Sequence, residues 1–200
     1  MESAMLKKPL TIFMLLLIAA CTARPTPAPT PSANQIDVEE QAVYEALLKQ
    51  TYSASMFVIM NTTSTGEGEA KISGSTVDYV LQNMHDVDQG TVDSFRARND
   101  AVHPQSPDMD LGIPYVLLSQ DQMNEMLSPN QSGWEVFYKN YPDAPGIINL
   151  SRVGFNPAFD QALVYIGNQS GWLAGSGLYV LLKKVDGAWT IDQKVITWVS

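Results

Sequence analysis

The sequence predicts a single α+β domain, with N-terminal helices packed on a curved, mainly antiparallel sheet that ends in a four-stranded meander. Apolar residues recur at helical spacing early in the chain, where Ala42, Val43, Ala46 and Leu47 share one face. The last third instead carries apolar runs separated by turn residues, at 146–155, 161–167, 177–185 and 189–199. Helices followed by an antiparallel meander are typical of the α+β class, in which helices cover one face of the sheet.

The N-terminal half is predicted to hold three helices and one strand. Asp37 can cap the first helix, with Glu40 at the reciprocal position of a capping box. Residues 55–62 contain a continuous apolar run, which predicts a strand buried on both faces. Helical spacing returns over 76–84, and Thr91 can cap a short third helix.

The middle of the chain is predicted to add one strand and two short helices. Residues 113–119 form the strand, because Pro114 is tolerated at a strand start. The helices are expected over 121–127 and from Ser132, where Glu135 completes a second capping box.

Turn residues separate the strands of the predicted meander. Asp186-Gly187 between two apolar runs predicts a tight two-residue hairpin. Asn156-Pro157 turns the first pair of strands, and residues 168–171 turn the second.

In element order, the domain resembles the NTF2-like domains, which also pair leading helices with a terminal meander. The resemblance covers the last third best. The strand at 55–62 and the helices after Ser119 depart from that outline.

The N-terminus has the layout of an export signal. Lys7 and Lys8 form a basic region, residues 10–18 an apolar run, and small residues follow up to Cys21. A membrane-spanning helix needs roughly 20 apolar residues, so this run is too short to be one.

The four residues Ile18-Ala19-Ala20-Cys21 resemble the lipobox of bacterial lipoproteins, whose cysteine is acylated and becomes the mature N-terminus. The resemblance implies lipidation of Cys21 and a protein anchored to the cell membrane or outer membrane, with its domain on the extracytoplasmic side. The alternative is an ordinary signal peptide that contains a cysteine. Which membrane and leaflet hold the anchor stays open.

Composition divides the chain into three parts. Residues 1–20 are the expected signal peptide, 21–35 the lipidated cysteine with a proline-rich tether, and 36–200 one globular domain. Alternating prolines favour extended polyproline II structure, so the tether is expected to act as a semi-rigid spacer. Cys21 is the only cysteine, which leaves the domain without a disulfide.

The charge of the exported part excludes one class of partner. Removing Glu2, Lys7 and Lys8 from the 21 acidic and 12 basic side chains leaves 20 and 10, a net charge of −10. An acidic surface repels phosphate backbones and anionic head groups. We therefore expect no nucleic-acid binding, and contact with the membrane only through the lipid on Cys21.

Catalytic motifs are missing from the sequence. It contains no phosphate-binding glycine loop, no nucleophile elbow and no His-Glu-x-x-His motif. Two short patterns could offer metal ligands, His85-Asp86-x-Asp88 and Asp108-x-Asp110-x-Gly112, but both are incomplete as metal sites. We expect no metal, no cofactor and no catalytic residue.

Arg152 and Trp172 are the two candidate ligand-binding residues. By strand alternation, Arg152 points the same way as Ile148 and Leu150, so it either pairs with a buried carboxylate or lines a cavity that accepts an anionic group. Trp172 lies in or beside a predicted turn, where an exposed aromatic side chain can mark a contact surface.

These observations favour a lipid-anchored, non-catalytic domain that binds a small anionic ligand or an envelope protein. One alternative is a pocket-forming enzyme that uses Glu135 or Asp160 with Tyr138 or a histidine as acid and base. Another is an envelope assembly factor that contacts its partner through a sheet edge.

Overall fold

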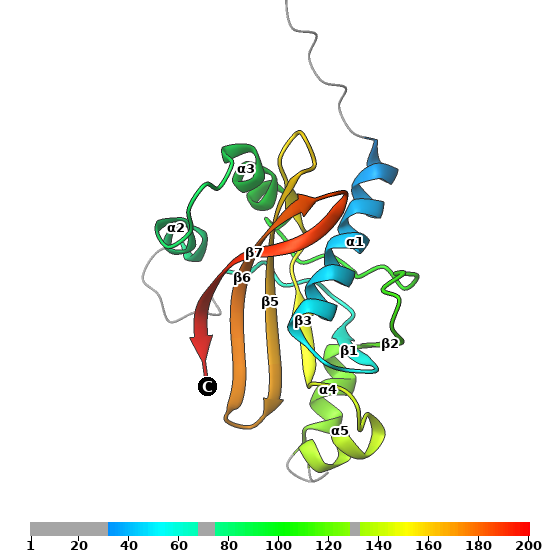
Figure 1. The fold of residues 1–200 in the computed structure, drawn as a ribbon. Coiled ribbons are helices and arrows are strands. Elements are labelled where there is room, and N and C mark those ends of the chain that lie inside the picture. The colour runs from blue at the N-terminus through cyan, green and yellow to red at the C-terminus, as the bar shows by residue number, and fades with distance from the viewer. Residues whose placement is uncertain (1–31, 68–74, 129–132) are drawn as a thin grey trace, which may run out of the picture.

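The computed structural model describes residues 32–67, 75–128 and 133–200 (Figure 1). Within these residues, five helices pack around one seven-stranded mixed sheet, so the fold is α+β as the sequence predicts. Cys21 and most of the expected tether lie outside the described residues.

The elements of the first half are α1 (Ala33–Thr51), β1 (Phe57–Met60), α2 (Thr76–Gln82), α3 (Gln89–Arg98) and β2 (Tyr115–Leu118). Those of the second half are α4 (Gln120–Met126), α5 (Trp134–Asn140), β3 (Ile147–Leu150), β4 (Gly154–Phe155), β5 (Gln161–Gly171), β6 (Ala174–Val185) and β7 (Ala188–Val199).

The sheet runs in the order β2-β1-β3-β5-β6-β7, and β4 pairs with β5 off this path. Strands β3 to β7 form the predicted antiparallel meander. Strand β1 extends the sheet beyond the meander and pairs in parallel with both β2 and β3. Asp186 and Gly187 both have positive φ in the β6–β7 turn, as a type I′ hairpin requires.

Helices cover both faces of the sheet, not one face as expected. On one face, α1 packs Val43 and Leu47 against Ile148 and Val164. On the other face, α2 and α3 cover one end of the sheet around Tyr165, and α4 and α5 cover the β1 side. Both faces are covered because the inner strands carry buried residues on both sides: β1 is buried along its whole length, and β5 is buried from its start to Gly167.

The predicted strand 146–155 is interrupted. It divides into β3 and β4 because two backbone N–H groups between them bond to side chains instead of a neighbouring strand. The N–H of Arg152 donates to Asn99 Oδ1 at 2.9 Å, and that of Val153 donates to Glu40 Oε1 at 2.7 Å.

Two helix starts in the first half of the chain differ from the predictions. Ser32 caps α1 in place of Asp37, so the helix begins inside the segment 21–35 assigned to the tether. Asp88 caps α3, whereas Thr91 is buried against Gln161.

The two helices after β2 also begin differently. Ser119 caps α4 and forms a capping box with Gln122. Gly133 precedes α5 without a side-chain cap, and the expected cap Ser132 lies outside the described residues.

Candidate functional site

Arg152 pairs with a buried carboxylate, which is one of the two alternatives for it. Its Nε donates to Glu40 Oε1 at 3.0 Å, and its Nη2 lies 2.8 Å from Glu40 Oε2. Arg98 Nη2 and the N–H of Val153 reach the same carboxylate at 3.0 and 2.7 Å. Glu40 thus accepts from two guanidinium groups and the backbone, and joins α1, α3 and the β3–β4 segment.

Arg152 also lines a pocket of about 280 Å³ between α1 and residues 104–109. The second alternative, in which Arg152 lines a cavity, therefore agrees with the structure as well. Burial lowers the pKa of Arg152, but the adjacent Glu40 carboxylate outweighs burial and raises it. Asp37 lies 3.6 Å from the same guanidinium. Because an incoming anion would meet the carboxylates of Glu40 and Asp37, this pocket is poorly suited to an anionic ligand.

Trp172 is exposed, as predicted from its place in a turn. It forms the β5–β6 turn with Leu173, and the two side chains are 60% and 86% exposed. The indole lies beside Gly133, where a Cβ would come within 2.5 Å of Trp172 Cζ2. Tyr138 of α5 braces the same hairpin by donating to the Ser170 carbonyl at 3.0 Å.

A second pocket lies on the face of the sheet opposite α1. Its floor is formed by residues that pair with one another on adjacent strands. Register places Asn149 of β3 beside Gly167 of β5, Gly167 beside Gly177 of β6, and Gly177 beside Trp198 of β7. Gly167 leaves open space beside the Asn149 amide, whereas the space above Gly177 is filled by the Trp198 indole and the Tyr165 hydroxyl. We call this second pocket the amide pocket.

The indole of Trp198 lies flat on the glycines of β6. A Cβ at Gly175 or at Gly177 would overlap the ring. Trp198 Nε1 donates to the Tyr165 hydroxyl at 2.9 Å, which fixes the ring orientation. One face of the indole is thus against the sheet, and the side chain stays half-buried.

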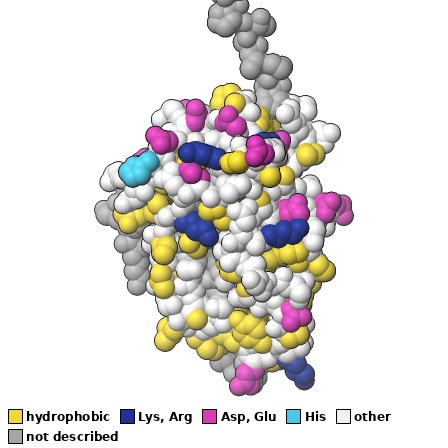
Figure 2. Space-filling model, in the orientation of Figure 1, with side chains coloured by type: hydrophobic (Ala, Val, Ile, Leu, Met, Phe, Trp, Pro, Cys, Tyr) yellow, Lys and Arg dark blue, Asp and Glu magenta, His cyan; other side chains and the backbone are white. Residues whose placement is uncertain are grey.

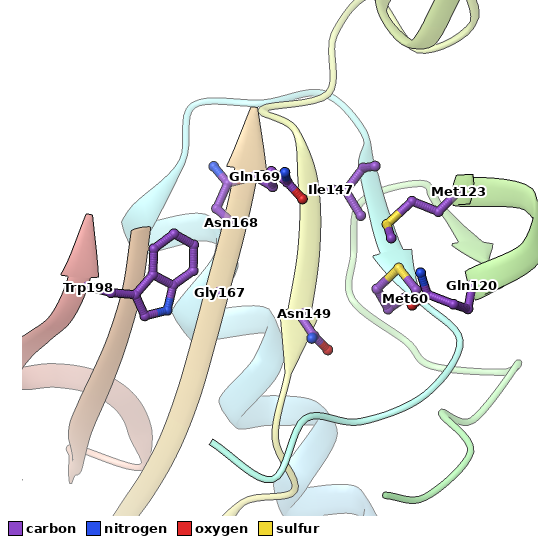
Figure 3. A pocket seen from close by; sticks show the side chains of 9 residues that line it. All are labelled: Met60, Gln120, Met123, Ile147, Asn149, Gly167, Asn168, Gln169 and Trp198. Carbon is purple, nitrogen blue, oxygen red and sulfur yellow. The ribbon is translucent and has the colours of Figure 1, made fainter. Parts of the chain in front are cut away.

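The amide pocket has a volume of about 170 Å³, and none of the described residues that line it has an ionisable side chain (Figure 3). Its lining comprises Met60, Gln120, Met123, Ile147, Asn149, Gly167, Asn168, Gln169 and Trp198. Figure 3 shows the methionines and Gln120 on one side of β3 and Trp198 on the other. Asn149 Oδ1 is buried and has no hydrogen-bond partner within the part of the chain that the structure describes, and a buried unpaired carbonyl costs roughly 1–3 kcal/mol.

The side chains named for the enzyme alternative either face solvent or form their own local hydrogen bonds. Glu135 is exposed on α5, and Tyr138 is held by Ser170. Asp160 is exposed in the β4–β5 turn, where it accepts from Asn156 at 2.6 Å. These side chains do not line the amide pocket.

The two possible metal patterns have local roles or face solvent. Asp88 caps α3, and His85, Asp108 and Asp110 are exposed or partly engaged in backbone turns. Among the described residues, no three His, Cys, Asp or Glu side chains are grouped as metal ligands would be. None of the helices in the described ranges combines the length and apolarity that a membrane span requires.

Comparison with known proteins returned no relative: neither a family model, nor a curated protein, nor a solved structure matches the chain.

Proposed function

We propose that this protein is a lipid-anchored, non-catalytic binding protein whose domain faces the extracytoplasmic side of a bacterial membrane. Lipid on Cys21 supplies the anchor, as the lipobox resemblance implies, and the amide pocket receives a ligand. The observation that carries the binding function is the Asn149 oxygen, which is unpaired among the described residues, in a pocket that those residues line without an ionisable side chain.

The pocket's composition favours binding over catalysis. General acid–base chemistry needs a titratable group within hydrogen-bond reach of the reacting atoms. Asn149, Gln120 and Gln169 can only accept or donate hydrogen bonds, and the remaining lining is apolar, amide or glycine. Such a set can recognise a ligand and hold its orientation without moving a proton.

The position of the pocket in the fold also supports this function. Helix α1 begins at one end of the molecule, and the β5–β6 turn lies at the opposite end (Figure 1). On the face displayed in Figure 2, charged side chains gather toward the end where α1 begins. A domain anchored through the segment before α1 would present the uncharged pocket and Trp172 away from an anionic membrane surface.

A second candidate function is contact with an envelope protein through the turn that bears Trp172 and Leu173. Two neighbouring exposed apolar side chains on a braced hairpin favour it. This contact and the pocket lie at the same end of the sheet, so one protein could use both.

Mapping of fragment binding tests the proposed function. Spectra of the ¹⁵N-labelled full-length protein in micelles are recorded with a library of neutral, anionic and cationic fragments. We expect neutral fragments to shift the amide signals of Asn149, Gly167 and Gln169, and anionic fragments to leave those of Arg152 unchanged.

The matched control is Gly167→Val, which fills the open space beside Asn149. The atoms nearest to a Cβ there belong to the Tyr165 ring, with the hydroxyl at 3.1 Å, so the variant requires this ring to move by a few tenths of an ångström. Fragment shifts should disappear in this variant while it stays folded. Shifts that persist in Gly167→Val, or that cluster around Arg152, would contradict the proposal.

A further inference from the structure

We infer that the ligand of the amide pocket is one ring of a neutral saccharide chain. This inference rests on the proposed binding function and adds the chemical class of the ligand. Three features of the pocket lead to it: the absence of charge, the flat indole and the arrangement of amide groups.

The first feature excludes charged groups. None of the lining side chains in the described ranges is ionisable, and the floor is the face of a sheet. An ammonium, carboxylate or phosphate placed there would lose water without gaining an opposite charge, which is costly. The group that enters the pocket is therefore neutral, and a hydroxyl on it would supply the hydrogen bond that Asn149 Oδ1 lacks among the described residues.

The second feature is the indole of Trp198. One ring face lies on Gly175 and Gly177, and the Nε1–H is already used by Tyr165. What the side chain offers a ligand is an apolar π-face, not a hydrogen bond. The axial C–H groups of a pyranose ring form a flat apolar face of the same size, which stacks on such a surface.

The third feature is the supply of amide groups around that platform. Asn149 offers a free acceptor on the floor, and Gln169 lies two residues from Gly167 on the same strand face. Each amide has both an acceptor and donors, so one side chain can engage two neighbouring hydroxyl groups. A ring with an apolar face and hydroxyl groups at its edge uses both kinds of contact together.

The volume indicates that one ring of a longer chain is bound. A pocket of about 170 Å³ is smaller than the roughly 300 Å³ at which sites for whole small-molecule ligands begin. The neighbouring exposed turn with Trp172 gives further rings a surface on which to lie. A peptide is the competing occupant, and the experiment separates the two.

The test is titration calorimetry on the full-length protein in a detergent without a sugar head group. The probes are a panel of neutral α- and β-linked tetrasaccharides, an anionic tetragalacturonate and a blocked tetra-alanine amide. We expect at least one neutral tetrasaccharide to bind, and the anionic saccharide and the peptide not to bind.

Three variants locate the site. Asn149→Leu and Trp198→Ala should each weaken binding of that saccharide at least about tenfold, the equivalent of one good hydrogen bond or stacking contact. Val185→Ala, an exposed apolar position at the end of β6 that does not line the pocket, is the control and should leave binding of the tetrasaccharide unchanged. Circular dichroism confirms that each variant is folded, and Asn149→Leu keeps the inference testable should Trp198→Ala unfold.

The outcomes separate this inference from the proposed function. If the peptide binds and no saccharide does, or if no neutral saccharide binds while neutral fragments still occupy the pocket, the ligand class is wrong and the binding site stands. If saccharide binding is unaffected in Asn149→Leu, the inference is overturned.

Discussion

Glu40 and Arg152 lie 112 residues apart in the sequence and form a two-point ion pair that joins α1 to the segment between β3 and β4. The Glu40 side chain is only 8% exposed, whereas that of Arg152 is 26% exposed. Glu40 is therefore the more buried member of the pair, and we expect substitutions of Glu40 and of Arg152 to differ in their effect on stability.

Arg152→Met is expected to destabilise the domain by about 2 kcal/mol. Breaking a buried pair costs roughly 3–5 kcal/mol when the remaining charge has no partner. Here Glu40 keeps Arg98 and the N–H of Val153, which lowers the cost. Urea unfolding measures the difference, and Arg96→Met, which breaks an exposed pair with Asp78, is the control with little effect. An unchanged or higher stability of Arg152→Met would contradict this account.

The Glu67 carboxylate predicts a pH effect at the start of α2. Burial raises its pKa, but hydrogen bonds from the N–H groups of Thr76 and Val77 and from Ser75 outweigh burial, so the pKa is lowered from 4.5. A lowered folded-state pKa means that the stabilisation is complete above the unfolded value and is lost as pH falls through the folded value.

We therefore expect the wild-type protein to lose its stability advantage over Glu67→Gln as pH falls below about 4.5. Melting temperatures of both proteins from pH 7 to pH 3 measure this. A difference that is constant across this range would show that the charge of Glu67 does not contribute.

Gln50 of α1 protects the outer edge of β7. Its Nε2 donates to the Trp189 carbonyl at 3.0 Å, and its Oε1 accepts from the N–H of Ile191 at 3.0 Å, which continues the ladder of the sheet. Gln50→Leu should cost about 1–2 kcal/mol and promote association through the freed edge. Light scattering and thermal unfolding check both effects. Gln35→Leu on the exposed part of α1 is the matched control, and equal behaviour of the two variants would refute the role of Gln50.

Cys21→Ser should abolish lipid attachment and release the protein from the membrane while the domain folds normally. The lipobox resemblance predicts this, and Cys21 is the only cysteine in the chain. Metabolic labelling with a fatty acid measures it. Equal labelling of wild type and variant would rule out acylation at this residue.

Local signals predicted several elements well. The continuous apolar run at 55–62 indicated a strand buried on both faces, and Asp186-Gly187 indicated a tight hairpin. Both depend on residues close together in the chain. The start of α1 was wrong because Glu40, suited to a capping box, instead receives two arginines from distant elements. The resemblance to NTF2-like domains stays a prediction.

The amide pocket could not be predicted in this way. Gly167 and Gly177 were interpreted as strand ends, yet both lie inside longer strands. Their pairing with each other, with Asn149 and with Trp198 depends on register across four strands. In the sequence, Asn149 looks like an ordinary polar residue on a solvent face.

Asn156 provides the contrast needed to test whether Asn149 has a functional role. Asn156 is also an asparagine of the meander, but its amide donates to Asp160 and accepts from the N–H groups of Asp160 and Gln161. Asn156→Leu leaves these groups unpaired, so it should cost about 2 kcal/mol or more.

The most direct test of the proposed site is the free energy of unfolding of Asn149→Leu, measured in urea against wild type and Asn156→Leu. Leucine has a similar size and removes a buried carbonyl that has no partner. The account predicts that stability stays equal or rises by up to about 1 kcal/mol, because a residue kept for binding is not optimised for folding. A loss comparable to that of Asn156→Leu would show that Asn149 serves the fold, and would contradict the assignment of the amide pocket as a binding site.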